Sequence, residues 1–138
     1  MKKFLTLAAF LFAVMVSSTT FAANWAAVDS EEGATIYVDK DSIKREIHSK
    51  FCGVDRADGF SANVKLEFVL PDGRMFKMIN LIGFFEDNSV KKMIFLERLD
   101  DNGNIAPDAE NHAEEQKADG SDGTVWPKVF DYVQKNLP

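Results

Sequence analysis

The clearest hydrophobic pattern in the chain is an alternation of apolar and polar residues between positions 60 and 70. Its apolar members are Val64, Leu66, Phe68 and Leu70. A period of two is typical of a β-strand with one apolar face. The sequence Pro71-Asp72-Gly73 follows, and proline close before glycine favours a hairpin turn. Residues 74–85 and 90–99 predict two further strands, so we expect an antiparallel meander over residues 60–99.

The second strand of this meander is apolar on both faces. One face carries Met75, Ile79, Leu81 and Phe85, and the other carries Phe76, Met78, Ile82 and Phe84. Because a sheet with one face in water alternates cleanly, both faces are expected to be covered. A C-terminal helix can cover one of them. A homodimer, with the Phe76/Met78/Ile82/Phe84 face as a candidate interface, is one solution for the other face. A closed monomer whose N-terminal hairpin covers the sheet is the alternative.

The N-terminal part of the chain contains shorter strand signals. Residues 24–29 and 34–39 flank a Ser-Glu-Glu-Gly turn and predict a β-hairpin. Residues 43–51 are expected to form a further strand, and residues 53–59 a loop. Single glutamates within apolar strands, such as Glu97, fit the wet side of an alternating strand.

The C-terminal residues 124–138 predict a short amphipathic helix. Its apolar positions have helical spacing and are Trp126, Val129, Phe130, Val133 and Leu137. Together with Trp25 and Tyr37 of the N-terminal hairpin, Trp126 is a candidate core aromatic. Residues 100–123 are acidic and lack an apolar stripe, so we expect a mobile, solvated loop there. The predicted fold is a single α+β domain over residues 24–138. It is mainly antiparallel β, with a meander sheet, an N-terminal hairpin and a C-terminal amphipathic helix.

Residues 1–23 have the layout of a secretory signal peptide. Lys2 and Lys3 precede an apolar run, and small residues lead to a cleavage site near Ala22 or Ala23. The apolar run of about thirteen residues is shorter than the roughly 20 that a membrane-spanning helix needs. The mature chain is therefore expected to be exported, periplasmic or secreted, without a transmembrane anchor.

Charge and cysteine content exclude several classes of function. The 138 residues carry a formal net charge of −6, and removing the leader leaves 14 basic and 22 acidic side chains. Such an acidic chain is unsuited to binding nucleic acid or an anionic membrane through bulk electrostatics. The single cysteine excludes an internal disulfide framework and a zinc site with several thiolates.

The candidate chemistry is sparse. His48 lies four residues before Cys52, so on one strand the two side chains would share a face. A Cys–His nucleophile pair or a metal site with two ligands would require this arrangement. A packed thiol explains Cys52 more simply, and a disulfide between two chains is a further alternative. Residues 100–104 resemble the start of a calcium loop, but Ile105 and Asn111 occupy the positions where that loop needs Gly and Glu. We therefore assign no catalytic or metal-binding residue and expect no cofactor.

The order of several short motifs resembles a known family of small secreted bacterial proteins, that of surface-adhesin protein E. The motifs are Trp25, Ile36-Tyr37-Val38-Asp39, Asp41-Ser42-Ile43, Lys44-Arg45, Asp101-Asn102-Gly103-Asn104 and Trp126-Pro127. The resemblance implies an exported, mostly antiparallel β domain with a C-terminal helix. The family's namesake is a lipid-anchored adhesin that dimerises and binds host matrix proteins and haem. This chain lacks the lipid-attachment cysteine and the paired cysteines, so we carry over no binding residue.

The sequence favours a non-enzymatic, extracytoplasmic binding or interaction module of a bacterial cell envelope. Its partner would be a protein or a small ligand, bound at a sheet face or edge. The alternative from another class is a small hydrolase or metal-dependent enzyme that uses Cys52 and His48. A self-associating structural protein is the third hypothesis.

Overall fold

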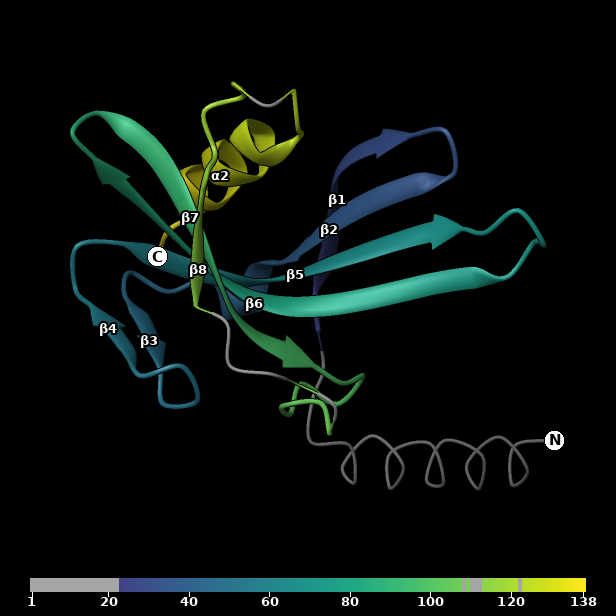
Figure 1. Cartoon of the computed structure of the whole chain (residues 1–138), viewed down its shortest axis with the longest axis horizontal. Coiled ribbons are helices and arrows are strands. Elements are labelled where there is room, and N and C mark those ends of the chain that lie inside the picture. The colour runs from purple at the N-terminus through teal and green to yellow at the C-terminus, as the bar shows by residue number, and fades with distance from the viewer. Residues whose placement is uncertain (1–22, 108, 110–112, 122) are drawn as a thin grey trace, which may run out of the picture.

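The computed structural model describes residues 23–107, 109, 113–121 and 123–138. Residues 1–22, which hold nearly all of the predicted signal peptide, lie outside the described residues. The main body is a six-stranded antiparallel sheet with the order β1-β2-β5-β6-β7-β8 (Figure 1). The elements are β1 (Trp25–Glu31), β2 (Ala34–Asp39), the 3-10 turn η1 (Lys40–Ser42), β3 (Ile47–Ser49), β4 (Val54–Arg56), β5 (Phe60–Val69), β6 (Met75–Asp87), β7 (Val90–Leu99), β8 (Glu114–Lys117) and the helix α2 (Trp126–Lys135). The predicted fold class, α+β and mainly antiparallel β, is confirmed.

The meander predicted over residues 60–99 is formed by β5, β6 and β7. Phe60 on β5 lies opposite Phe84 on β6, and Ile79 on β6 lies opposite Leu99 on β7. The predicted turn closes the first hairpin, where the Leu70 N–H donates to the Arg74 carbonyl at 2.7 Å. Local alternation and turn chemistry therefore suffice to define the centre of the sheet.

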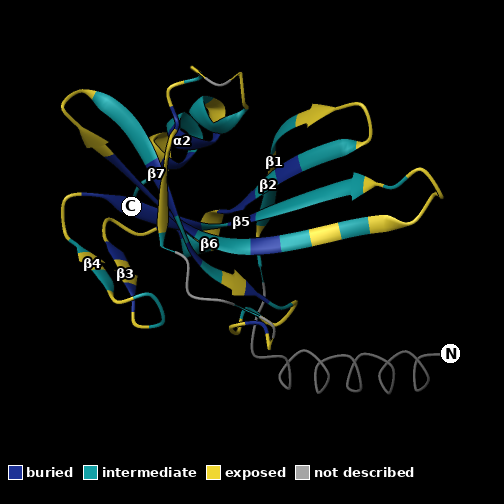
Figure 2. Ribbon diagram, in the orientation of Figure 1, coloured by how far each residue is buried: buried dark blue, intermediate teal, exposed yellow. Residues whose placement is uncertain are grey.

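Helix α2 covers one face of the sheet, as its apolar stripe predicted. Phe130 of α2 is fully buried and contacts two sheet aromatics edge to face, with ring centroids 5.1 Å from Phe60 and 5.8 Å from Phe84. Figure 2 shows the buried residues gathered where the helix meets the strands. At ten residues α2 is too short to span a membrane, and no other helix in the described part of the chain is long and apolar enough.

A small hairpin of β3 and β4 packs on the opposite face of the sheet. Its Ile47 is fully buried and occupies a notch left by two glycines, Gly59 and Gly83. A Cβ atom at Gly83 would lie only 2.7 Å from Ile47 Cγ2, so the glycine makes room for the isoleucine. On the sheet side, Phe85, Ile94 and Leu96 complete this second core cluster.

This hairpin corrects two expectations. Residues 43–51 do not form one strand, because only Ile47–Ser49 of this segment belong to β3. Residues 53–59 are not only a loop, because Val54–Arg56 form β4.

The N-terminal hairpin of β1 and β2 does not close over the sheet, because β2 pairs with β5 and extends the sheet sideways.

One copy of the chain covers both faces of the middle of β6. Phe84 is 0% exposed under α2, and Phe85 is 1% exposed under the small hairpin. A second copy is therefore not required there. Coverage is thinner at the start of β6, where Met75 is 63% exposed and Phe76 and Met78 are half-buried. The homodimer remains a prediction.

The acidic segment at 100–123 contains a strand that the sequence did not indicate. Strand β8 pairs with β7, with Lys117 opposite Lys92, although all four of its residues are exposed. The next residue, Ala118, is fully buried, and its N–H donates to the Lys91 carbonyl at 2.8 Å. A strand can join a sheet edge through backbone hydrogen bonds alone, which is why the missing apolar stripe misled the prediction.

Candidate functional site

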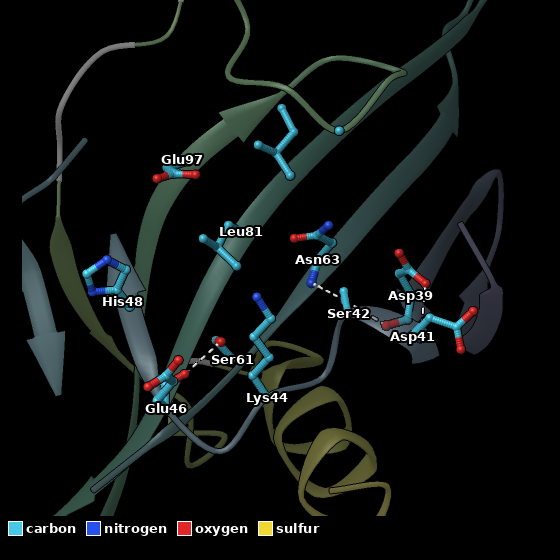
Figure 3. Close-up of a pocket in the computed structure, with 12 residues that line it drawn as sticks. Asp39, Asp41, Ser42, Lys44, Glu46, His48, Ser61, Asn63, Leu81 and Glu97 are labelled. Atoms are coloured by element: carbon cyan, nitrogen blue, oxygen red, sulfur yellow. Dashed lines mark hydrogen bonds between the residues drawn. The ribbon is translucent and has the colours of Figure 1, made fainter. Parts of the chain in front are cut away.

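A cleft of about 480 Å³ opens on the sheet face that carries the β3–β4 hairpin, beside that hairpin (Figure 3). Its lining is mostly polar and comprises Asp39, Asp41, Ser42, Lys44, Glu46, His48, Ser61, Asn63, Leu81, Glu97, Leu99 and Gly103. These residues come from the end of β2, η1, the segment between η1 and β3, β3 itself, strands β5, β6 and β7, and the turn that follows β7.

Four lining residues form one row across the sheet. Asn63 on β5 lies opposite Leu81 on β6, and Leu81 lies opposite Glu97 on β7. Continuing the β2–β5 register by one residue beyond Val38 sets Asp39 opposite Asn63. Because directly paired residues share a face, the row presents a carboxylate, an amide, an aliphatic group and a second carboxylate to the cleft.

A β-bulge places Glu97 in this row. Leu81 pairs with Glu97 while Ile82 pairs with Phe95, so Leu96 is an extra residue in β7. A bulge lets two successive side chains occupy the same face. Leu96 fills the core under the small hairpin, and the half-buried Glu97 lines the cleft beside it. The expectation that Glu97 merely lies on the wet side of a strand missed this site, since nothing in its sequence neighbourhood marks the bulge.

The Glu97 carboxylate is held in place by the small hairpin. The Ser49 hydroxyl donates to Glu97 Oε1 at 2.8 Å, and Ser49 is almost fully buried. Ser49 Oγ in turn accepts a hydrogen bond from the Cys52 N–H at 3.1 Å. The position of Glu97 therefore depends on the docking of β3 and β4 onto the sheet.

At the other end of the row, Asp39 joins β2 to η1. Its Oδ1 accepts hydrogen bonds from the N–H groups of Asn24 at 2.9 Å and Asp41 at 3.1 Å. Asp39 is only 2% exposed. In the part of the chain that the structure describes, its Oδ2 accepts no hydrogen bond, and Figure 3 shows the carboxylate turned toward the Asn63 side of the cleft.

The wall formed by residues 42–46 is fixed to β5 by hydrogen bonds. The Ser42 hydroxyl donates to the Asp39 carbonyl at 2.7 Å and accepts from the Asn63 N–H at 2.8 Å. Lys44 and Ser61 exchange two backbone hydrogen bonds of 3.0 and 2.9 Å. Because the backbone of this wall is anchored, the Lys44 side chain projects from a fixed base.

The cleft has a negative charge balance. Four carboxylates line it, on Asp39, Asp41, Glu46 and Glu97, against the single ammonium of Lys44. Within the described residues that ammonium forms no ion pair, and in Figure 3 it extends toward Leu81. The cleft can therefore bind cationic groups at its carboxylates and an anionic group at Lys44.

The structure does not bring His48 and Cys52 into one site. The exposed His48 ring lies at the rim of the cleft, with Nδ1 3.7 Å from Asp55 Oδ1. The half-buried Cys52 packs into the core under the small hairpin, where its thiol donates to the Leu96 carbonyl. The expectation of a shared face is wrong because β3 ends at Ser49, before Cys52.

Among residues 23–107, 109, 113–121 and 123–138, no group of three or more His, Cys, Asp or Glu side chains is arranged to hold a metal ion. The start of the calcium-like segment is a turn, in which Asp100 Oδ1 accepts from the N–H groups of Asn102 and Asn104 at 2.8 and 3.1 Å.

Hydrogen bonds lower the pKa of two exposed carboxylates, Asp58 and Asp119. A hydrogen bond from Arg56 lowers the pKa of Asp58, and the same bond raises the pKa of Arg56. Hydrogen bonds from Ser121 lower the pKa of Asp119.

The three candidate core aromatics have different environments. Trp126 packs against the helix-side core, with its ring 5.6 Å from that of Phe95. Trp25 and Tyr37 are half-buried on the cleft side of the sheet and do not belong to the core, which corrects the expectation for both. The Lys65 ammonium lies over both rings, 4.7 Å from Trp25 and 4.5 Å from Tyr37, where a cation is attracted to the π-faces.

No protein-family model matches the chain, and no curated protein or solved structure matches it either. The resemblance to the surface-adhesin protein E family therefore stays a prediction. The functional hypothesis rests on the geometry of the cleft.

Proposed function

We propose that this protein is a non-enzymatic binding module of a bacterial cell envelope, and that it binds a small polar ligand in the cleft. The observation that carries the proposal is the cleft itself, a hollow of about 480 Å³. Ligand sites typically measure roughly 300–1,000 Å³ and combine a few convergent polar groups with apolar surface. Export is supported by the leader pattern at residues 1–23 and not by the cleft.

The hydrogen bonds around the cleft support a binding site that exists before the ligand arrives. Ser42 ties η1 to β5, and Ser49 holds Glu97 on β7. A site whose groups are already ordered loses less conformational entropy on binding. The cleft is therefore suited to recognition by fixed polar groups.

The enzyme alternative has weaker support. A nucleophile and its base need to lie within hydrogen-bond reach, but Cys52 and His48 each have separate partners. The two serine hydroxyls of the cleft are engaged with the backbone: Ser42 donates to the Asp39 carbonyl, and Ser61 donates to the Glu46 carbonyl at 2.8 Å. Binding without chemical turnover is the simpler use of this arrangement.

Amide NMR spectra test the proposal. A panel of small polar compounds, comprising amino acids, diols, dicarboxylates and monosaccharides, is added to isotope-labelled protein. We expect at least one compound to shift Ser42, Asn63 and Glu97 in a saturable way. An Asn63→Tyr variant, which fills the cleft, should lose these shifts. A Glu115→Tyr variant on the exposed strand β8 should keep them. Saturable binding confined to other surfaces would overturn the proposal, as would breakdown of any compound by the protein.

A further inference from the structure

We propose that the ligand is a basic amino acid, with two cationic nitrogen groups and one carboxylate. This inference rests on the proposed function of the cleft and adds the chemical class of its ligand. It follows from the order of the groups in the Asp39–Asn63–Leu81–Glu97 row and from the position of Lys44.

The two ends of the row are matched to two cations. Asp39 on β2 and Glu97 on β7 are separated by strands β5 and β6. Three strand spacings of about 4.8 Å put their backbones roughly 14 Å apart, and both side chains face the cleft. A single small cation cannot contact two carboxylates so placed. A ligand with two cationic groups joined by an aliphatic chain can reach both when its chain is extended and the two side chains lean toward each other over Asn63 and Leu81.

The buried carboxylate of Asp39 has a free acceptor. Both of its hydrogen bonds end on Oδ1, and within the described residues Oδ2 has no donor. Although Asp39 is only 2% exposed, Oδ2 is in contact with solvent, because no fully buried side-chain oxygen of the described residues lacks a hydrogen-bond partner. An ammonium group of the ligand would take the place of water at Oδ2.

The middle of the row suits the rest of such a ligand. Leu81 provides an apolar contact for methylene groups, and Asn63 provides an amide beside it. Lys44 extends toward Leu81 from the opposite wall and has no anionic partner in the described residues (Figure 3). A carboxylate on the ligand would pair with this ammonium, whereas a plain diamine would leave the two like charges facing each other.

Three matched compounds separate these contributions. L-Lysine carries both ammonium groups and the carboxylate, L-norleucine lacks the side-chain ammonium, and 1,5-diaminopentane lacks the carboxylate. We expect L-lysine to bind in the cleft, and each of the other two to bind at least about ten-fold more weakly, since each loses a charge-assisted contact. Calorimetry gives the affinities, and amide shifts at Asn63 and Glu97 give the location.

Two variants assign the contacts to residues. Glu97→Gln keeps an acceptor for Ser49, so the fold should be retained. Because the substitution removes the carboxylate charge, this variant should have a smaller preference for L-lysine over L-norleucine. Lys44→Met should lower the affinity for L-lysine to the affinity for 1,5-diaminopentane. The affinity for 1,5-diaminopentane itself should not fall. Glu67→Gln and Lys77→Met are matched controls on the same sheet face outside the cleft, and both should bind L-lysine like the unaltered protein.

The outcomes are distinguishable. L-Norleucine binding as tightly as L-lysine would overturn the inference, and so would a Lys44→Met variant with unchanged affinity for L-lysine. If L-glutamate or 1,5-pentanediol shifts the cleft residues and L-lysine does not, the ligand class is wrong while the proposed function stands. If none of these compounds nor any of the wider panel shifts the cleft residues, both proposals fail.

Discussion

Leu81 on β6 lies directly opposite Glu97 on β7 because β7 contains one extra residue, Leu96. Without this bulge, the residue opposite Leu81 would be Leu96, and the sheet would present two leucines at this point. The bulge instead adds a carboxylate to the row while Leu96 still fills the core. The site and the second core thus arise from the same irregularity in one strand.

The contact of Ile47 with Gly83 predicts a measurable energetic coupling. Ile47→Ala should lower the free energy of unfolding by roughly 2–5 kcal/mol, because it leaves a cavity in a fully buried position. Gly83→Ala should also destabilise the protein, since its Cβ would lie 2.7 Å from Ile47 Cγ2. In the double variant the smaller side chain at position 47 makes room for the added methyl, so the combined loss should be less than the sum. Urea unfolding of the four proteins measures this, and strict additivity would contradict the packing described.

The hydrogen bond between Ser49 and Glu97 predicts a stability effect of its own. Ser49→Ala removes a donor to a carboxylate, and such bonds contribute about 1.5–3 kcal/mol. We expect Ser49→Ala to lower the free energy of unfolding less in a Glu97→Leu background than in the unaltered protein. Chemical denaturation of this double-mutant cycle is the measurement. Equal losses in both backgrounds would show that Ser49 acts independently of Glu97.

The position of Cys52 predicts that it does not link two chains. Its thiol points into the core and donates to the Leu96 carbonyl, so a disulfide to another copy would have to expose it. The sedimentation-derived mass should therefore be the same under reducing and oxidising conditions, and the same in Cys52→Ala. A doubled mass that appears only under oxidising conditions and vanishes in Cys52→Ala would contradict this prediction and would show that Cys52 links two chains.

The pair of Arg56 and Asp58 predicts a local pH dependence. The hydrogen bond from Arg56 lowers the pKa of Asp58, so the charged pair stabilises the fold above the ordinary aspartate pKa of about 3.9. This stabilisation is lost as the pH falls through the lowered pKa of Asp58. Arg56→Met should move the Asp58 titration upward in carboxyl NMR spectra, whereas Arg74→Met, in another hairpin, should not. An unchanged Asp58 titration in Arg56→Met would contradict the pairing.

Much of the sheet follows from local sequence. The alternation at 60–70 and the turn at Pro71-Asp72-Gly73 predict the first two meander strands, and they are found there. The stripe that includes Phe130 predicts the docking face of α2. These features are predictable because the periods of two and 3.6 residues are fixed by backbone geometry.

The cleft depends on features without a local signature. Strand β3 has three residues, too few for a periodic pattern. It depends on the glycine notch formed by Gly59, in the bend before β5, and Gly83 on β6, neither of which adjoins β3 in the sequence. The bulge at Leu96 is visible only in the pairing register. Asp39 caps the 3-10 turn through Oδ1, but only the tertiary structure places Asp39 in the lining of the cleft.

The most direct test of the cleft as a ligand site is a nuclear Overhauser measurement between L-lysine and methyl-labelled Leu81. Leu81 lies at the centre of the row, so the methylene protons of bound L-lysine should give cross-peaks to its methyl groups. The Asn63→Tyr variant should lose these cross-peaks. Cross-peaks from saturably bound L-lysine to methyl groups remote from the cleft, with none to Leu81, would contradict the assignment.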